Sequence, residues 1–329
     1  MKHKNIKRTI TALLLAAFLA TAAFAAFNAC SGRSSLYTEG KGELNVVCTV
    51  FPPFDFAKNV GGDKVTLTLL QSNGADLHNF SPTVKTLEAL SQADVFICIG
   101  GVSDTWVDQA LSASGNTDAV IIKLTDEVEL LTAELSEDWQ GHDHSEHDHD
   151  HEHTGDEHVW TSLKNVSAIV SKIETVFSQK DPENASFYAQ NAAVYKAKLS
   201  ALDARYEEAV SNATRDTVVF ADRFPFVYLT HDYKISYFAA FGGCSTEANA
   251  TIEMRRTLTD AVRTLNLPAV IIIDGSNDTS LADAICADTG CVKLKMNSMQ
   301  SITRRDIESG VSYVQIMEDN LSVLISALG

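Results

Sequence analysis

Short apolar runs alternate along the chain with stretches in which apolar residues recur every three or four positions. The short runs are rich in β-branched residues, as expected for strands of a sheet covered on both faces. They occupy residues 44–50, 65–70, 95–100, 119–124, 217–220, 237–241, 269–274 and 292–296. The stretches with helical spacing include residues 54–60, a segment after Ser81-Pro82, and residues 159–177, 226–232, 254–265, 281–288 and 311–328. Strands that alternate with helices predict parallel α/β sheets.

The longest helical pattern separates the strands into two groups. It begins at Asp181-Pro182-Glu183, where Asp is the expected N-cap and Pro the first helical residue, and it continues to about Ser211 without Gly or Pro. Its length of roughly 44 Å exceeds what one small lobe needs. We therefore predict an α/β fold of two parallel-sheet lobes joined by one long helix. The predicted parts are an N-terminal lobe at 44–180, a linking helix at 181–212 and a C-terminal lobe at 213–329.

The first residues have the features of an export signal. Four basic residues precede an apolar run at 10–27, which ends shortly before Cys30. Residues 1–29 are the predicted signal peptide, and 30–43 a polar tether. Cys30 resembles the lipidated cysteine of bacterial lipoproteins, although Phe27 and Asn28 depart from the usual pattern before it. An uncleaved single-span anchor is the alternative. Both place the body of the protein outside the cytoplasmic membrane, and a lipid on Cys30 would anchor it to the bacterial cell membrane.

Charge and cysteine content exclude several classes of function. The formal net charge is −17, and removing the basic signal region makes the chain more acidic still, which argues against nucleic acid or anionic lipid as a partner. Cys48 and Cys98 lie in apolar runs and are predicted to be buried thiols. Cys286 and Cys291 are close enough to bridge, but sequence does not settle their pairing. No CxxC occurs, which argues against a thiolate zinc cluster or a thioredoxin-type site.

A histidine-rich tract at 141–158 suggests metal handling. It holds seven of the ten histidines and no Lys or Arg. Such a segment cannot enter an apolar core, so we predict a solvated loop at 141–157. Imidazole is a common ligand of zinc, copper and nickel, and carboxylates raise the local cation concentration. A solvated acidic linker without a metal role is the alternative. Six of its histidines alternate with Asp and Glu: His142, His144, His147, His149, His151 and His153.

Three longer motifs resemble those of a known family, the extracytoplasmic substrate-binding lipoproteins of zinc and manganese ABC importers. They are VVCTVFPPFDFAKNVGGDKV, LLQSNGADLHNFSPTVKTLEALSQADVFICIGG and DEHVWTSLKN, and the likeness covers nearly all of residues 44–328. A His-rich loop before the third motif is typical of zinc-importing members. The resemblance implies a monomer with a metal cleft between its lobes. It also implies a membrane permease and its ATPase as partners.

The resemblance implies that His78 and His158 are metal ligands from the N-terminal lobe. Both lie in loops expected at the carboxyl edge of the sheet, where open α/β sheets bind ligands. Asp76 would be an acceptor that orients His78. Two imidazoles leave two positions of a tetrahedral zinc site to be filled.

The second lobe departs from the family pattern, in which a His or Glu directly follows the first strand. Here Ala221 takes that position and Asp222 follows it. Asp222 is either a ligand or the N-cap of the next helix. Glu247, in the loop CSTEAN, is the other carboxylate candidate. Asn297 is a poor zinc ligand, and His231 is expected to be a surface histidine of a helix.

The leading functional hypothesis is capture of extracellular zinc for an ABC importer. The ligand set would also accept manganese, and the His-rich tract favours zinc. A surface adhesin that merely shares the fold is the alternative from another class. A zinc hydrolase is disfavoured because HExxH, GxSxG and GxxxxGK[ST] are all missing from the sequence. We therefore predict a protein that is not an enzyme.

Overall fold

The computed structural model describes residues 36–72, 80–132, 155–243, 250–276 and 278–329. The predicted signal peptide, Cys30 and residues 141–154 of the His-rich tract lie outside these ranges, as do Asp76, His78 and Glu247.

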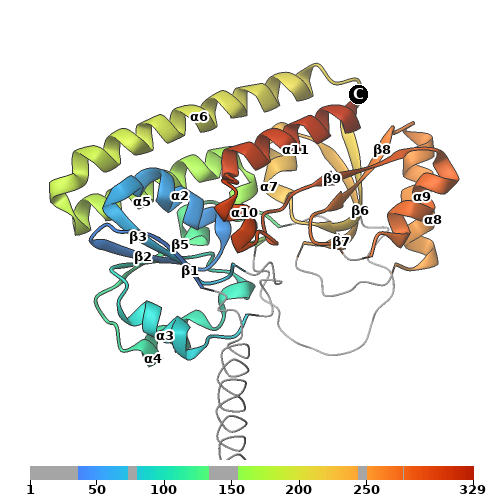
Figure 1. Ribbon diagram of the computed structural model, residues 1–329. Helices are drawn as coiled ribbons and strands as arrows, with labels where there is room; N and C mark the ends of the chain where they lie inside the picture. Colours follow the sequence, from blue (N-terminus) through green and yellow to red (C-terminus); the bar gives the residue numbers. More distant parts are fainter. Residues whose placement is uncertain (1–35, 73–79, 133–154, 244–249, 277) are drawn as a thin grey trace, which may run out of the picture. The chain divides into compact units, whose positions relative to one another are not determined.

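The first sheet has the strand order β1-β3-β2-β4-β5 (Figure 1). Four strands run parallel, as predicted, and β1 pairs antiparallel with β3 at one edge. The strands are β1 (Tyr37–Gly40), β2 (Leu44–Cys48), β3 (Val65–Leu69), β4 (Val95–Cys98) and β5 (Val120–Lys123).

Helices cover both faces of this sheet (Figure 1). Val46 and Cys48 of β2 belong to the core under α2 and α5, whereas Val47 between them belongs to the core under α3 and α4. Both faces are therefore apolar, which explains the unbroken hydrophobic runs in the sequence. The helices are α2 (Phe51–Gly61), α3 (Val84–Ser91), α4 (Val107–Ser114) and α5 (Leu163–Lys180). The connections contain the 3-10 turns η1 (Gly62–Lys64), η3 (Val102–Asp104), η4 (Leu124–Glu127) and η6 (Val159–Thr161).

The second sheet has the order β7-β6-β8-β9, and all its neighbouring strands are parallel. Helices α8 and α9 pack on one face, and α7 and α11 contribute to the core on the other. The strands are β6 (Thr217–Phe224), β7 (Ser236–Gly242), β8 (Ala269–Ile273) and β9 (Val292–Met296). The helices are α7 (Val227–Tyr233), α8 (Ile252–Thr264), α9 (Ser280–Thr289), α10 (Arg304–Glu308) and α11 (Tyr313–Leu328).

The long helix α6 (Ala185–Ser211) follows the 3-10 turn η7 (Pro182–Asn184) and runs alongside both groups of elements (Figure 1). It packs against α2 and α5 from the first group and against α7 and α11 from the second. Its buried residues are spaced by three or four positions, so one face of the helix is continuous with the cores of both sheets. These buried residues are Tyr188, Ala192, Tyr195, Leu199, Leu202 and Tyr206.

Three local features differ from the sequence-based predictions. Residues 37–40 of the predicted tether form β1, because Tyr37 packs on Phe54 and the strand pairs with β3. Thr83 caps α3, so Pro82 precedes the helix instead of starting it. Strand β6 continues to Phe224 past a register shift after Phe220, because Arg223 and Phe224 still pair with β7. Asp222 therefore lies within an irregular stretch of β6, not beyond its end.

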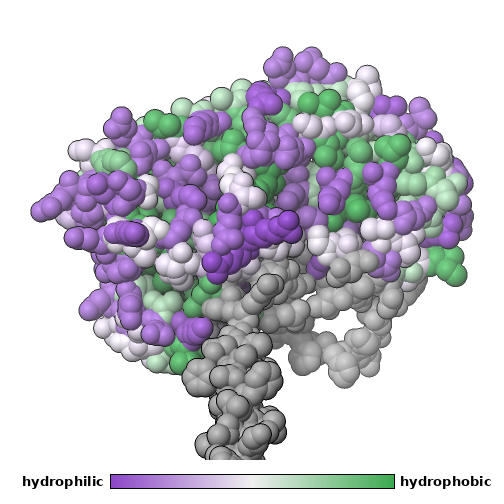
Figure 2. Space-filling view, viewed as in Figure 1, coloured by the Kyte–Doolittle hydropathy of each residue, from purple (hydrophilic) through white to green (hydrophobic). Residues whose placement is uncertain are grey.

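The surface of the described residues is largely hydrophilic on the face shown in Figure 2, with hydrophobic side chains in smaller patches. Across the part of the chain that the structure describes, no helix combines the length and apolar character needed to cross a bilayer.

Candidate metal site around His158

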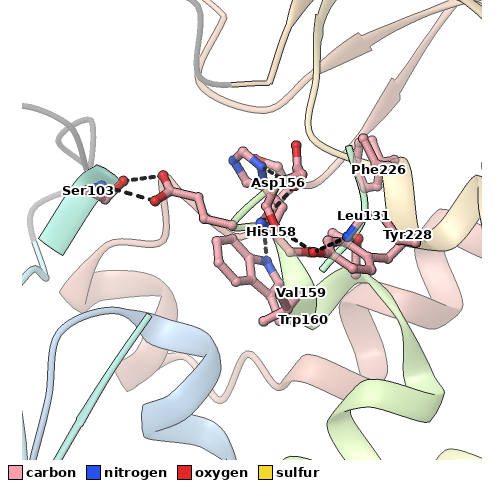
Figure 3. A network of polar contacts seen from close by, with 12 residues as sticks. Ser103, Leu131, Asp156, His158, Val159, Trp160, Phe226 and Tyr228 are labelled. Carbon is pink, nitrogen blue, oxygen red and sulfur yellow. Dashed lines mark hydrogen bonds and ion pairs between the residues drawn. The ribbon is translucent and has the colours of Figure 1, made fainter. Parts of the chain in front are cut away.

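His158 lies in the short segment that leads into α5, where its ring is fully buried. One carboxylate oxygen of Asp156 accepts the backbone N–H of His158 at 2.8 Å and its Nδ1 at 2.9 Å (Figure 3). A carboxylate oxygen can only accept, so Nδ1 carries the proton of the neutral ring. The lone pair is then on Nε2, which is the tautomer that a metal-binding imidazole requires.

Gln300, from the loop after β9, reaches the Nε2 side of His158. Its side-chain nitrogen contacts Nε2, so the amide faces the atom that would bind a metal. The loop is held in an unusual conformation, since the buried Met299 has a φ of +66°. The Asn297 side chain accepts the Met299 N–H at 2.8 Å and stabilises this conformation. Strained backbone held in place by its surroundings is characteristic of functional sites.

Trp160 supports the segment by packing against the imidazole of His158. Its ring lies 5.3 Å from the ring of His158 in an edge-on arrangement. The indole Nε1 donates to the Ser298 carbonyl at 3.0 Å, and the Tyr313 hydroxyl donates to the Trp160 carbonyl at 2.8 Å. His158 precedes the long helix in sequence, yet its surroundings include α11 and the loop after β9 from the second half of the chain.

Glu157, the residue before His158, binds Ser103 of η3. It is 2% exposed, and its carboxylate accepts both the backbone N–H of Ser103, at 3.0 Å, and the hydroxyl of Ser103. A β-carbon at Gly101 would collide with this carboxylate and with the Glu157 β-carbon, so a larger residue there would displace Glu157. Nearby Asp104 accepts the N–H groups of Ile99 and Gly100, and burial raises its pKa to about 6. The residue before His158 is thereby anchored to the first sheet.

Asp222 is buried in β6, and both its carboxylate oxygens have backbone partners. One accepts the N–H of Arg223 at 2.8 Å and the other the N–H of Ile273 at 3.1 Å. The N-cap position of α7 belongs to Phe226 and not to Asp222. Among the described residues, no three His, Cys, Asp or Glu side chains gather closely enough to hold a metal, so Asp222 and His158 are not brought into one such group.

His78 and Glu247 lie outside the described residues, but Gly243, the last described residue before Glu247, lies beside the His158 ring. A β-carbon at Gly243 would come within 2.9 Å of the His158 ring, so glycine permits this close approach. The Ser72 carbonyl accepts the backbone N–H of Arg304 at 2.6 Å.

Comparison with known proteins identifies the family. Residues 46–327 match the family described as zinc-uptake complex component A, periplasmic. The chain belongs to this family.

Individual relatives agree with that assignment. The zinc-binding lipoprotein AdcA of Streptococcus pneumoniae serotype 4 is 30% identical over 296 residues, which make up 90% of this chain and 57% of that relative. The chain thus spans little more than half the length of this relative. The high-affinity zinc uptake system protein ZnuA of Bacillus subtilis (strain 168) is 27% identical over 319 residues, 94% of this chain and 96% of that protein.

A solved structure shares the fold. The Zn(II)-bound ZnuA-like domain of Streptococcus pneumoniae AdcA superposes with a TM-score of 0.70 at 27% identity. The match covers 87% of this chain and 99% of that domain.

Sequence reasoning missed two residues that contact the His158 ring. Asp156 stands two positions before His158 in DEHVW, a spacing that allows one carboxylate to bind both backbone and ring of the same histidine. Gln300 lies 142 positions away along the chain. Nothing in the local pattern around Gln300 marks it, whereas Asn297, which sequence did single out, uses its side chain to hold the loop.

Proposed function

We propose that this protein captures zinc outside the cytoplasmic membrane and delivers it to the permease of an ABC importer, whose ATPase drives uptake. Membership of the zinc-uptake family supports this function. The observation that carries it is the His158 ring, which is buried, bound to the Asp156 carboxylate through Nδ1, and directs Nε2 towards the loop of Gln300. This arrangement prepares one imidazole for metal binding before the ion arrives.

The proposed donor set contains His158, His78 and at least one carboxylate. Glu247 lies four residues after Gly243, which approaches the His158 ring. Asp222 remains a candidate because each carboxylate oxygen that accepts one backbone N–H keeps a second lone pair. Gln300 can add its side-chain oxygen if the amide rotates. Zinc sites with histidine and carboxylate ligands are usually four-coordinate, which these candidates can satisfy.

Zinc is the proposed cargo, and manganese the alternative. Two imidazoles suit zinc, while manganese prefers sites dominated by carboxylate, carbonyl and water oxygens. The six histidines between 142 and 153 would add weak sites that collect zinc near the cleft. If deletion of 142–153 changes neither the uptake rate nor the number of zinc ions bound at limiting zinc, the collecting role is wrong.

The proposed organisation keeps the predicted signal peptide at 1–29, a lipid on Cys30 and a monomeric mature protein. The lobes and linking helix are proposed at the boundaries given above, with one change. The N-terminal lobe begins at Tyr37 because β1 is a strand of its sheet.

The decisive experiment is metal analysis of the mature protein, with competitive zinc and manganese titration against a chelator. We expect one tightly bound zinc ion, and a loss of at least about 100-fold in zinc affinity in His158→Ala and His78→Ala. His231→Ala is the matched control, since that imidazole on α7 is 66% exposed. Unchanged zinc affinity in both ligand variants would overturn the site. Normal growth of a deletion strain in zinc-depleted medium would contradict delivery to a permease.

A further inference from the structure

The hydroxyl of Tyr228, on α7, closes a ring of hydrogen bonds next to His158 (Figure 3). It donates to the Asp156 carbonyl at 2.5 Å and accepts the Leu131 N–H at 3.3 Å. The Asp156 N–H donates in turn to the Leu131 carbonyl at 2.6 Å. Leu131 and Asp156, which lie on either side of residues 132–155, are therefore bound to each other and to one phenol from the second half of the chain.

We propose that Tyr228 is a positioning residue for metal binding, which holds Asp156 so that Asp156 can orient His158. This inference rests on the proposed function, because it assigns Tyr228 to the same site. Tyr228 would not touch the metal itself.

Asp156 makes four hydrogen bonds around this site. Its N–H binds Leu131, its carbonyl accepts Tyr228, and its carboxylate accepts both the N–H and the Nδ1 of His158. Fixing the backbone on both sides of the Asp156 α-carbon fixes the direction of the Cα–Cβ bond, and the two bonds to His158 then hold the carboxylate that projects from it. Acceptors of this kind set the tautomer and direction of a ligating imidazole.

The environment of Tyr228 makes its hydroxyl difficult to replace. The side chain is 2% exposed, and burial raises the pKa of the phenol to about 12, so it remains a donor at neutral pH. Without the hydroxyl, the Leu131 N–H would lose its acceptor and the Asp156 carbonyl would lose its donor. Both groups would then face the buried ring of residue 228 without a partner there. Unpaired buried polar groups are costly, so the segment is expected to rearrange.

The same helix makes a second contact with the His158 segment. Asp232 of α7 accepts the hydroxyl of Ser162, the N-cap of α5, at 2.6 Å. Two bonds from one helix therefore hold residues on both sides of His158. A displacement of α7, which directly follows β6, would reach the imidazole through Asp156.

Tyr228→Phe removes the hydroxyl and keeps the ring. Tyr233→Phe is the matched control, because Tyr233 is on the same helix, is 6% exposed and donates to Asp203 at 2.7 Å, away from His158. Zinc affinity is measured by chelator competition on the mature protein. The His158 tautomer is read from the ¹⁵N shifts of the ring in metal-free protein, and Tm gives the stability of each variant.

We expect Tyr228→Phe to weaken zinc binding about 3- to 30-fold, below or within the 10- to 100-fold that direct partners of ligands contribute. The Nδ1–H tautomer of His158 should lose its predominance. Tyr233→Phe should lower Tm by about as much as Tyr228→Phe does, but it should change zinc affinity less than twofold. Wild-type affinity and an unchanged tautomer in Tyr228→Phe would overturn the inference, as would an equal loss of affinity in Tyr233→Phe. If wild-type protein binds no zinc, or His158→Ala binds it normally, the proposed function itself fails.

Discussion

Asp156 binds His158 twice through one carboxylate oxygen, at the backbone N–H and at Nδ1 of the ring. The two bonds fix both the position of the residue and the rotation of its imidazole. A histidine held in this way has lost most of its rotamer freedom before any ion binds, so less entropy is lost when a metal is bound.

Asp156→Asn tests this relationship. The amide oxygen can still accept both bonds, but the negative charge that favours Nδ1–H is lost. We expect zinc affinity to fall about 10-fold, at the lower end of the range for partners of ligating histidines. Chelator competition at fixed pH measures it. Asp118→Asn, at an exposed carboxylate, is the control and should match wild type. An affinity in Asp156→Asn equal to wild type would show that the carboxylate does not prepare the ring.

Gln300→Glu tests the contact on the opposite side of the imidazole. A carboxylate at the position of the amide would face the same Nε2 region and add an anionic oxygen donor for zinc. We expect zinc affinity to rise about tenfold, which corresponds to about 1.4 kcal/mol. Gln315→Glu makes the same change at an exposed position of α11 and should leave affinity unchanged. Zinc affinity equal to wild type in Gln300→Glu would mean that Gln300 lies outside the coordination region.

The pH dependence of stability should include a contribution from Asp55 of α2. It is 4% exposed, and burial raises its pKa from 3.8 to about 6 despite the hydrogen bond from Tyr195 at 3.1 Å. Because the folded state binds the proton more tightly, the stability that Asp55 contributes is complete below pH 4 and is lost as pH rises through about 6. The slope is up to about 1.4 kcal/mol per pH unit.

Asp55→Asn abolishes this ionisation. The free energy of unfolding of the variant, minus that of wild type, should therefore increase between about pH 4 and pH 6, as measured by urea unfolding. Asp181→Asn should show the opposite sign and a lower pH range, below about pH 4, since the Tyr188 hydroxyl holds the pKa of Asp181 below its usual value. A difference for Asp55→Asn that does not vary with pH would contradict the assignment.

The pairing of Cys286 and Cys291, which sequence left open, becomes a specific prediction. Their sulfur atoms are 3.5 Å apart, with Cys286 in α9 and Cys291 just before β9, and both are free thiols. Burial and the neighbouring thiol raise the pKa of Cys286 to about 12, so attack on a disulfide is slow at neutral pH.

Oxidised glutathione at mildly alkaline pH should form the Cys286–Cys291 disulfide and release two molecules of reduced glutathione. The protein should lose two hydrogen atoms in mass and gain about 2 kcal/mol in stability from closing a short loop. Cys291→Ser should block the mass change. Two thiols at these positions that remain open to alkylation after the treatment would contradict the prediction.

The sequence contained most of the information about the fold and less about the site. Hydrophobic periodicity predicted the long helix and the burial of Tyr188, Tyr195 and Tyr206 within it. This was possible because apolar residues three or four positions apart lie on the same face of a helix. The same reasoning placed Cys48 and Cys98 in the core, where both are fully buried. Local patterns of this kind reflect one element packing on its neighbours.

Features that depend on distant pairing were missed. The extension of β6 past Phe220 depends on β7, and the place of residues 37–40 in the sheet depends on β3. Gln300 meets His158 only because β9 and the segment before α5 end side by side in the folded chain. No local spacing carries such information, so the sequence offered His158 as a candidate ligand, which stays a prediction, but it did not indicate Gln300 beside it.

The bonded pair of Leu131 and Asp156 has a consequence for how this protein can change over evolutionary time. Leu131 and Asp156 are bound to each other and to Tyr228. The stretch of chain between them can therefore gain or lose residues without moving the imidazole of His158. Doubling the length of a closed loop costs only about 0.6 kcal/mol. Selection can therefore adjust how many histidines lie between Leu131 and Asp156 while the geometry at His158 is inherited unchanged.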